Sequence, residues 1–308
     1  MRLGAGAQGF RKRRSGVVSQ AVCPTTVSAV LRSQTAFIDE LGFALTLAQP
    51  PQRIISLVPS LTETLFSLGL EQEVIAVTKY CVAPGSLVAP LPKVGGTKNP
   101  DLDAILDLRP DLVIANAEEN RRQHVEWLRA RGVAVYVTYP RSVAGALETI
   151  LNLGRLTGRE DRASLLAREI VSRVSAIEAQ LGIWNKLSFR AFCPIWKSPW
   201  ITFNKDTYAH DVLRLMGFKN VFGAATERYP RTKLEQALEL RPDVILLPDE
   251  PYTFNSSDIG ELKQALPPML ARRVVAISGR DLHWYGAHMA SGLTSLAALL
   301  NKVRVSLV

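Results

Sequence analysis

The sequence predicts an α/β protein of two Rossmann-like lobes with mainly parallel sheets, joined by one long rigid helix, with a ligand cleft between the lobes. Three observations predict this fold. A segment in the first half is nearly copied in the second, and a stretch of 22 residues without Gly or Pro lies between the two copies. The 308 residues are also enough for two hydrophobic cores of ordinary size.

The repeat comprises residues 102–115, LDAILDLRPDLVIA, and residues 234–247, LEQALELRPDVILL. Each copy is typical of a short amphipathic helix, a proline-containing turn and a strand too apolar to be an exposed edge. Such units build parallel sheets covered by helices on both faces. Two copies therefore predict two similar lobes, and the function is expected in the cleft between them.

The first lobe is predicted to span residues 34–157. Residues 37–47 favour a hairpin that turns near Gly42, and residues 53–58 favour a buried strand. A helix then begins at Pro59–Ser60, where Ser60 is the expected N-cap and Glu63 its capping-box partner, and ends at Gly69. Strands at 74–77 and 133–137, a loop at 91–99 and helices at 125–131 and 143–156 complete the lobe.

The connecting helix is predicted within residues 158–182. Apolar residues between Glu160 and Leu181 follow helical spacing, and 22 residues give a length of about 33 Å, enough to reach from one lobe to the other. The second lobe, 183–308, is expected to contain strands at 189–194, 200–203 and 273–277 and helices at 208–216 and 291–303. The lobe boundary is then the helix itself.

The charge of the chain is concentrated at its N-terminus. Residues 1–33 contain six Arg and Lys residues and no acid, so the net charge falls from +9 to +3 when this segment is left aside. A general phosphate-binding surface, and with it a nucleic-acid partner, is not expected. The cysteines, Cys23, Cys81 and Cys193, are spaced too widely for a metal or redox pair.

Residues 1–33 are expected to be either a basic tail or a poor signal segment. Arg11 to Arg14 resemble the charged region of an export signal, and residues 27–29 resemble a cleavage site, but the segment between them is only weakly apolar. A start codon placed too early is a further alternative.

Residues that follow the predicted strands form the candidate site, because ligands of open α/β sheets bind beyond the carboxyl ends of the strands. They are Pro59–Thr62, Tyr80, Gly95–Thr97, Glu118–Asn120, Trp196, Trp200, Asn204, Asp249–Tyr252 and His283–Tyr285. Three of the five tryptophans are among them. Aromatic rings at these places favour a large, flat and partly apolar ligand, although some rings at strand ends only seal the top of a lobe.

Catalytic motifs are missing from the sequence. The four histidines show no metal-binding spacing, and no Gly-rich phosphate loop follows a strand. Ser60 is not in a Gly-x-Ser-x-Gly context. His283, the one histidine predicted in the cleft, is either an axial contact to the metal of a ligand or an ordinary polar wall residue. We therefore expect neither an enzyme nor an intrinsic cofactor or bound metal.

Asp103 and Glu235 occupy equivalent positions near the start of the two repeated helices. An acid there stabilises the helix N-terminus. The functional alternative is that each lobe presents one carboxylate to arginines of a docking partner with a two-lobed surface.

Several motifs resemble a known family. RIISLVPSLTETL at 53–65, LG at 68–69, KVGG at 93–96 and LRPDLV at 108–113 are similar, in this order, to the substrate-binding proteins of ABC importers for cobalamin, haem and ferric siderophores. The family is also known as the helical-backbone metal receptors. The resemblance extends over about residues 37–300, and it is strongest to the cobalamin-binding branch.

The resemblance implies a monomer with two lobes that move little, a cleft for cobalamin or a related corrinoid, and delivery of this ligand to an ABC permease that docks on Asp103 and Glu235. It also implies a periplasmic or cell-surface location. The residues expected at the ligand, from strand position and resemblance together, are Ser60, Tyr80, Thr97, Trp196, Trp200, Tyr229, His283, Trp284 and Tyr285.

Two features depart from the family pattern: Thr97 stands where an aromatic residue is expected, and the export signal is poor. The alternatives are a haem or ferric-siderophore binding protein, with Arg231 as a cation near the cleft, and a cytoplasmic corrinoid carrier or sensor. A two-lobed enzyme such as a glycosyltransferase is the alternative from another class, but it needs a phosphate-binding turn or an acid/base pair that the sequence does not show.

Overall fold

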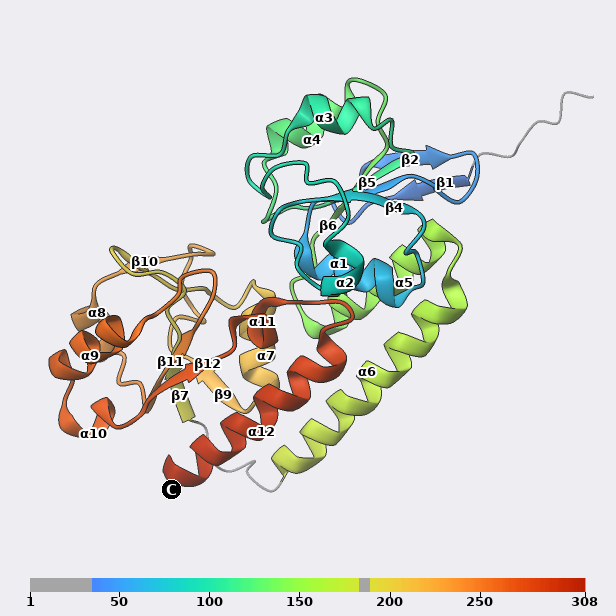
Figure 1. Ribbon diagram of the computed structural model, residues 1–308. Helices are drawn as coiled ribbons and strands as arrows, with labels where there is room; N and C mark the ends of the chain where they lie inside the picture. The colour runs from blue at the N-terminus through green and yellow to red at the C-terminus, as the bar shows by residue number, and fades with distance from the viewer. Residues whose placement is uncertain (1–34, 183–188, 308) are drawn as a thin grey trace, which may run out of the picture. The chain divides into compact units, whose positions relative to one another are not determined.

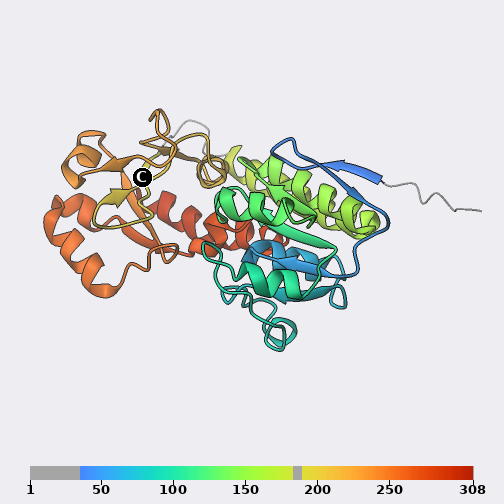
Figure 2. The same cartoon turned by 90° about the horizontal axis from the view of Figure 1, so that it is seen from above.

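The computed structural model of the protein describes residues 35–182 and 189–307. Residues Gln34–Val308 form one compact unit. The segment 1–33, expected to be a basic tail or signal, lies outside the described residues, and so does Cys23. The described residues contain two lobes, each with a four-stranded parallel sheet, which Figure 1 and Figure 2 show from the side and from above.

The sheet of the N-terminal lobe has the order β4 (Val74–Val77), β3 (Ile54–Ser56), β5 (Leu112–Asn116), β6 (Val135–Thr138), with all pairs parallel. Its strands are buried on both faces, as expected for apolar strands of a parallel sheet. Ile55 packs in a cluster with α3 (Leu102–Asp107) and α4 (Arg122–Arg129). Ile54 packs on the other face with α1 (Pro59–Ser67) and α5 (Val143–Thr157). This lobe also contains the short helix α2 (Gly85–Val88).

The sheet of the C-terminal lobe has the same architecture, in the order β12 (Val274–Ile277), β11 (Val244–Pro248), β7 (Phe189–Phe192), β9 (Phe218–Asn220). One face packs with α8 (Leu234–Glu239) and α9 (Ser256–Ala265). The other face packs with α7 (Tyr208–Leu215) and α12 (Met289–Leu307). The short helices α10 (Pro268–Ala271) and α11 (Gly279–His283) precede and follow β12.

Two small antiparallel sheets complete the fold. β1 (Thr35–Ile38) and β2 (Ala44–Leu47) form the predicted hairpin around Gly42. β8 (Trp200–Ile201) pairs with β10 (Arg231–Thr232) in the C-terminal lobe.

The long helix α6 (Glu160–Leu181) has the predicted bounds and links the lobes. It packs on α5 of the N-terminal lobe and on α7 and α12 of the C-terminal lobe (Figure 1). Its residues Ile170 and Ile177 belong to one apolar cluster that contains Ile54 at one end and Val244 at the other. The fold class predicted from the sequence is therefore confirmed, and both lobes share a continuous core.

The sequence repeat has the same conformation in both lobes. Arg109 and Arg241 precede the prolines of the two copies, and both have positive φ angles, 46° and 48°. After each proline an aspartate accepts a backbone N–H at the start of a sheet strand: Asp111 from Arg53, just before β3, at 3.0 Å, and Asp243 from Arg190 of β7 at 2.7 Å. The aspartate of each repeat therefore satisfies a backbone N–H at the start of β3 or β7, where an unpaired N–H would reduce stability.

The predicted capping role of Ser60 was wrong. Helix α1 begins at Pro59, so the N-cap is Val58, and the helix has no side-chain cap. Proline suits the first helical position because it has no N–H to satisfy there. Ser60 is thus one residue inside the helix, and the Glu63 carboxylate lies near Arg280 and His288 instead of reaching back to the helix start.

Candidate functional site

A cavity of about 600 Å³ lies between the lobes at the carboxyl ends of both parallel sheets. The N-terminal lobe contributes residues that follow β3, β5 and β6, and the C-terminal lobe contributes residues that follow β7, β11 and β12. This is the place where open α/β sheets bind ligands, because loops from several strands converge there. The volume is within the range of roughly 300–1,000 Å³ typical of small-molecule sites.

Aromatic side chains from both lobes form much of the cavity wall. Tyr80 comes from the N-terminal lobe, and Trp196, Tyr229 and Trp284 come from the C-terminal lobe. Tyr80 is 54% exposed and Trp196 is 43% exposed, so their rings are available to a ligand rather than packed in a core. The wall therefore offers flat apolar contacts on two opposite sides.

Eight of the nine expected ligand-facing residues line this one cavity: Ser60, Tyr80, Thr97, Trp196, Tyr229, His283, Trp284 and Tyr285. Trp200 does not. Its ring stacks on Phe254 at a centroid distance of 6.0 Å and contacts Phe192 edge-on, in the cluster on the opposite face of the sheet. Trp200 lies on β8, which pairs with β10, and its side chain packs in that cluster. The prediction that Trp200 faces the cleft is therefore wrong.

Arg231 is also absent from the cavity wall. It lies on β10 and is exposed, so the cation expected near the cleft for an anionic ligand is not supplied by this residue.

Three polar groups in the cavity wall have no ionic partner among residues 35–182 and 189–307. Glu119 lines the cavity and forms no ion pair in this part of the chain. Oε1 of Glu250 and Nε2 of His283 are buried and make no hydrogen bond. Burial lowers the pKa of His283 to about 4, so its imidazole is neutral at neutral pH.

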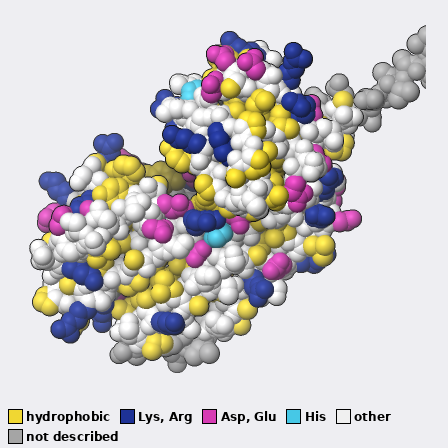
Figure 3. All heavy atoms as spheres, in the orientation of Figure 1, with side chains coloured by type: hydrophobic (Ala, Val, Ile, Leu, Met, Phe, Trp, Pro, Cys, Tyr) yellow, Lys and Arg dark blue, Asp and Glu magenta, His cyan; other side chains and the backbone are white. Residues whose placement is uncertain are grey.

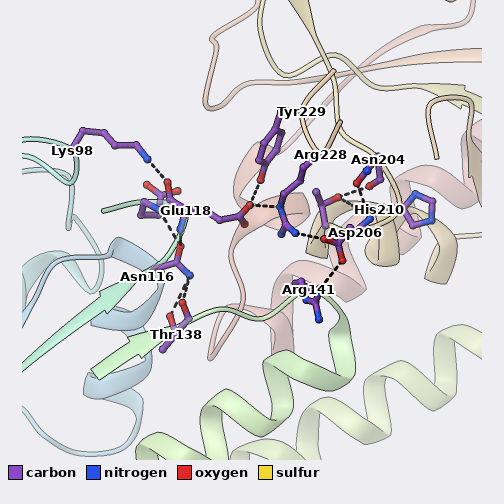
Figure 4. Close-up of polar contacts among 12 residues, drawn as sticks. Lys98, Asn116, Glu118, Thr138, Arg141, Asn204, Asp206, His210, Arg228 and Tyr229 are labelled. Carbon is purple, nitrogen blue, oxygen red and sulfur yellow. Dashed lines mark hydrogen bonds and ion pairs between the residues drawn. The ribbon is translucent and has the colours of Figure 1, made fainter. Parts of the chain in front are cut away.

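An alternating chain of charges joins the lobes beside the cavity (Figure 4). Glu118 of the N-terminal lobe accepts from Nε of Arg228 at 2.7 Å and from the Tyr229 hydroxyl at 2.5 Å. Arg228 also donates to Asp206 at 2.8 Å, and Asp206 accepts from Arg141 of the N-terminal lobe at 2.9 Å. We call Glu118, Arg141, Asp206, Arg228 and Tyr229 the interlobe network.

A second contact between the lobes lies under the cavity. The Thr64 hydroxyl of α1 accepts from the backbone N–H of Ala287, and the hydroxyl groups of Thr138 and Tyr285 lie 3.2 Å apart. Gly286 has a φ of 91° and lies against Thr64, where a Cβ atom would come within 2.1 Å of Oγ1. Only glycine therefore permits this close approach of the two lobes.

The sequence analysis singled out Tyr229 but not Glu119, Glu250 or the other residues of the interlobe network. Residues 118–120 and 249–252 were expected near the cleft as residues that follow strands, but nothing in their pattern showed which side chains point inward. Asp206, Arg228 and Arg141 come from three separate loops, and only the folded chain brings them together.

Asp103 and Glu235 lie in the first turns of α3 and α8, and both are exposed. Within the described ranges neither forms an ion pair, and the N-cap of α3 is Asp101, which accepts the N–H of Ala104. Figure 3 shows acidic side chains over α3 on one lobe and near α8 on the other. The two carboxylates thus occupy equivalent, unengaged positions on the two lobes.

In the part of the chain that the structure describes, no group of three or more His, Cys, Asp or Glu side chains is arranged to hold a metal ion. Cys81 and Cys193 are free thiols, both buried, and burial raises the pKa of each. None of the helices in the described ranges is long and apolar enough to cross a membrane.

Comparisons with known proteins agree with this architecture. A vitamin B12-binding protein of Vibrio parahaemolyticus is 30% identical over 207 residues, which is 66% of this chain and 73% of the relative. The crystal structure of the periplasmic vitamin B12 binding protein BtuF of Vibrio cholerae superimposes with a TM-score of 0.72 at 23% identity, over 83% of this chain and 98% of that one. The periplasmic heme-binding protein RhuT of Roseiflexus sp. RS-1 gives a TM-score of 0.70 at 21% identity, over 82% and 98%.

The structures show the shared fold, and the match to a protein family shows the class. Residues 54–278, which include most of both lobes and the helix between them, match the family described as periplasmic binding protein. Proteins of this class bind a substrate for an ABC transporter and do not transform it. The two-lobed chain with its interlobe cavity belongs to the periplasmic binding protein family.

Proposed function

We propose that this protein binds cobalamin or a related corrinoid in the cavity between its lobes and delivers it to an ABC import permease. The observation that carries the proposal is the aromatic wall: Tyr80 on one lobe faces the cavity together with Trp196 and Trp284 on the other. Wide aromatic surfaces suit the flat face of a macrocycle. The relative from Vibrio parahaemolyticus, named a vitamin B12-binding protein, supports the same ligand.

His283 fits this proposal as a neutral nitrogen in the cavity wall. Its Nε2 is buried without a hydrogen-bond partner, and a neutral imidazole is a good ligand for a transition metal. We propose His283 as an axial contact to the metal of a bound chelate.

Haem is the second candidate, and the fold it shares with RhuT supports it. Bound haem would place two anionic propionate groups in the cavity. Among the described lining residues, Lys98 is the single Lys or Arg side chain. Arg231 does not contribute, and so the cavity is a weak match for an anionic chelate.

We propose Asp103 and Glu235 as the docking points for the permease. Each is an exposed carboxylate without an ion pair in the described structure, and the two occupy equivalent turns of the two repeats. A permease with two arginines at a matching separation would form ion pairs with both carboxylates. These ion pairs would orient the cavity of the binding protein toward the entrance of the permease. This role places the mature protein, as a monomer, in the periplasm or at the cell surface.

Fluorescence titration of the full chain with cyanocobalamin, haemin and a ferric siderophore tests the ligand assignment. A coloured chelate bound between Trp196 and Trp284 should quench tryptophan emission strongly and saturably at micromolar concentration or below. W196F and W284F should each reduce the quenching. W127F is the matched control, because Trp127 lies on α4 under the Arg131 guanidinium and is outside the cavity lining.

Saturable quenching by cyanocobalamin that depends on Trp196 and Trp284 supports the proposal. Saturation by haemin or the siderophore alone would keep the cavity as the site but replace the ligand. Absence of saturable quenching by any of the three would contradict the proposed function.

A further inference from the structure

The cavity is acidic. Three carboxylates line it, Glu118, Glu119 and Glu250, against one cationic side chain, Lys98. His283 adds no positive charge at neutral pH, since burial holds its pKa at about 4. The net charge of the described lining is thus negative, although the protein as a whole is basic.

The cations next to the cavity are already engaged. Figure 4 shows Arg228 held between Glu118 and Asp206, and Arg141 held by Asp206. The ammonium group of Lys98 donates to the backbone carbonyl of Glu118. An anionic ligand would have to break these contacts to reach a positive charge, which leaves carboxylates of the protein unpaired.

The remaining two carboxylates form no ion pair within residues 35–182 and 189–307, although the charge of Lys98 acts on Glu119 and that of Arg280 acts on Glu250. Glu119 follows β5 of the N-terminal lobe, and Glu250 follows β11 of the C-terminal lobe. The two are close enough that, after burial and Asp249, the charge of Glu119 also contributes to the raised pKa of Glu250. The pKa of Glu250 is raised by burial and by the neighbouring Asp249, and the pKa of Glu119 is raised by desolvation. The Trp284 side chain interacts with the Glu250 carboxylate, but Oε1 of this group has no hydrogen-bond partner in the described residues, so the cavity retains an acceptor for a ligand.

We propose that Glu119 and Glu250 form a pair of acceptors, one on each lobe, that selects chelates with amide N–H groups at their edge and rejects chelates with free carboxylates there. The inference rests on the proposed function and names its selectivity. Cobalamin carries acetamide and propionamide side chains around its ring, whereas haem carries propionates. A carboxylate accepts from an amide N–H but repels another carboxylate, so the same two residues attract one class and exclude the other.

The test compares corrinoids that differ only in this group, with haemin as a chelate of the other class. Cyanocobalamin is compared with its three singly hydrolysed derivatives, in each of which one propionamide has become a carboxylate, and with haemin. Dissociation constants are measured by calorimetry at neutral pH with the full-length wild type, E119Q, E250Q and the double variant. E126Q is the control, because Glu126 is an exposed carboxylate of α4 paired with Arg122. Thermal unfolding of each variant verifies that it is folded.

We expect the wild type to bind at least one of the three acids at least tenfold more weakly than cyanocobalamin, and to bind haemin more weakly still. In E119Q or E250Q this ratio should fall toward one, because a glutamine amide can donate to the carboxylate of the ligand. E126Q should keep the wild-type ratio.

Other outcomes separate the inference from the function on which it rests. Equal affinity of the wild type for cyanocobalamin and all three acids overturns the inference and leaves corrinoid binding intact. Unchanged selectivity in the double variant overturns it as well. Preference for haemin over cyanocobalamin, or no binding of any corrinoid, overturns both.

Discussion

Arg228 and Glu118 connect the two lobes through a contact of 2.7 Å between Nε and Oε1, and Arg228 at the same time holds Asp206. The side chains of Arg228 and Glu118 are 19% and 27% exposed, so the pair is only partly screened by water. The ring of Tyr139 lies 4.9 Å from the guanidinium carbon and adds a contact from the N-terminal lobe. Glu118 and Tyr229 also line the cavity, so the interlobe network forms part of the cavity wall.

R228M should weaken the contact between the two lobes beside the cavity. Loss of a half-buried charge-assisted hydrogen bond removes roughly 1.5–3 kcal/mol and leaves Glu118 without its cation. We expect a lower melting temperature and faster association and dissociation of the ligand, measured by thermal unfolding and stopped-flow fluorescence.

The matched control is R122M, because Arg122 pairs with Glu126 on the exposed surface of α4. Its effect on stability should be about 0.5 kcal/mol or less. In a double-mutant cycle of E118Q and R228M, additive effects would show that the two residues do not act as a pair.

E250Q should stabilise the ligand-free protein at neutral pH. The pKa of Glu250 is raised above its ordinary value of 4.5, first by burial and then by Asp249. The folded state therefore holds more protons on this group than the unfolded state, and the carboxylate costs stability as the pH rises through this range. We expect a gain of on the order of 1 kcal/mol, about 2 °C, at neutral pH.

The gain of E250Q should shrink as the pH is lowered and disappear below the ordinary pKa of a glutamate, where both the folded and the unfolded state are protonated. Thermal unfolding from neutral to acid pH measures it. A melting temperature that falls in E250Q at neutral pH would mean that Trp284 and Arg280 stabilise the carboxylate by more than its burial costs, and would contradict this prediction.

His288 should make the folded protein more stable at acid pH than at alkaline pH. Its Nε2 lies 2.8 Å from Asp281 and its Nδ1 lies 3.7 Å from Glu63, and the two acids raise its pKa above 6.5. Arg280, 3.6 Å from the same Glu63 oxygen, also faces the site. The stabilisation is complete below the ordinary pKa and is lost as the pH rises through the raised pKa.

H288Q should therefore be less stable than the wild type by roughly 1.5–3 kcal/mol at mildly acid pH, with a smaller difference at alkaline pH. Chemical denaturation across this range gives the comparison. A difference that stays constant with pH would show that packing, and not the charge of His288, supports its contacts with Glu63 of α1 and Asp281 of α11.

Charge reversal at both Asp103 and Glu235 should abolish transport and leave ligand affinity unchanged, because both side chains lie outside the cavity lining. Growth on cobalamin of a host that lacks its own binding protein, complemented with this chain behind a host export signal, measures transport. E148K/E169K changes the charge equally at exposed sites on α5 and α6 and should transport normally. Loss of ligand affinity in D103K/E235K would refute the docking assignment.

Much of the fold could be predicted because its units are local and repeated. The copies at 102–115 and 234–247 predicted α3, β5, α8 and β11, and the uninterrupted helical pattern predicted α6. The three-residue strand β9 was missed because it is too short to show a period. Helix α9 was missed although Asn255 and Asp258 form its capping box, a signal that the sequence did contain.

The candidate site was predictable only in part. Strand ends placed Trp196, Trp284 and Tyr285 in the cavity wall, because the topology of a parallel sheet brings these ends together. Trp200 was misplaced because a strand end does not determine which way the side chain points, and here Phe254 offers it an apolar partner. The direction of Glu119 and Glu250 depends on loop geometry, which no local pattern encodes.

The apolar cluster that passes from Ile54 through Ile170 to Val244 has a practical consequence for finding the ligand. Because the same core supports both lobes, they should melt together, as one cooperative unit. A chelate held in the cavity then raises the melting temperature of the whole chain in proportion to the logarithm of its concentration over its dissociation constant, whichever lobe contributes more contacts. Unlabelled and colourless chelates can accordingly be ranked by thermal shift alone, with no chromophore and no permease.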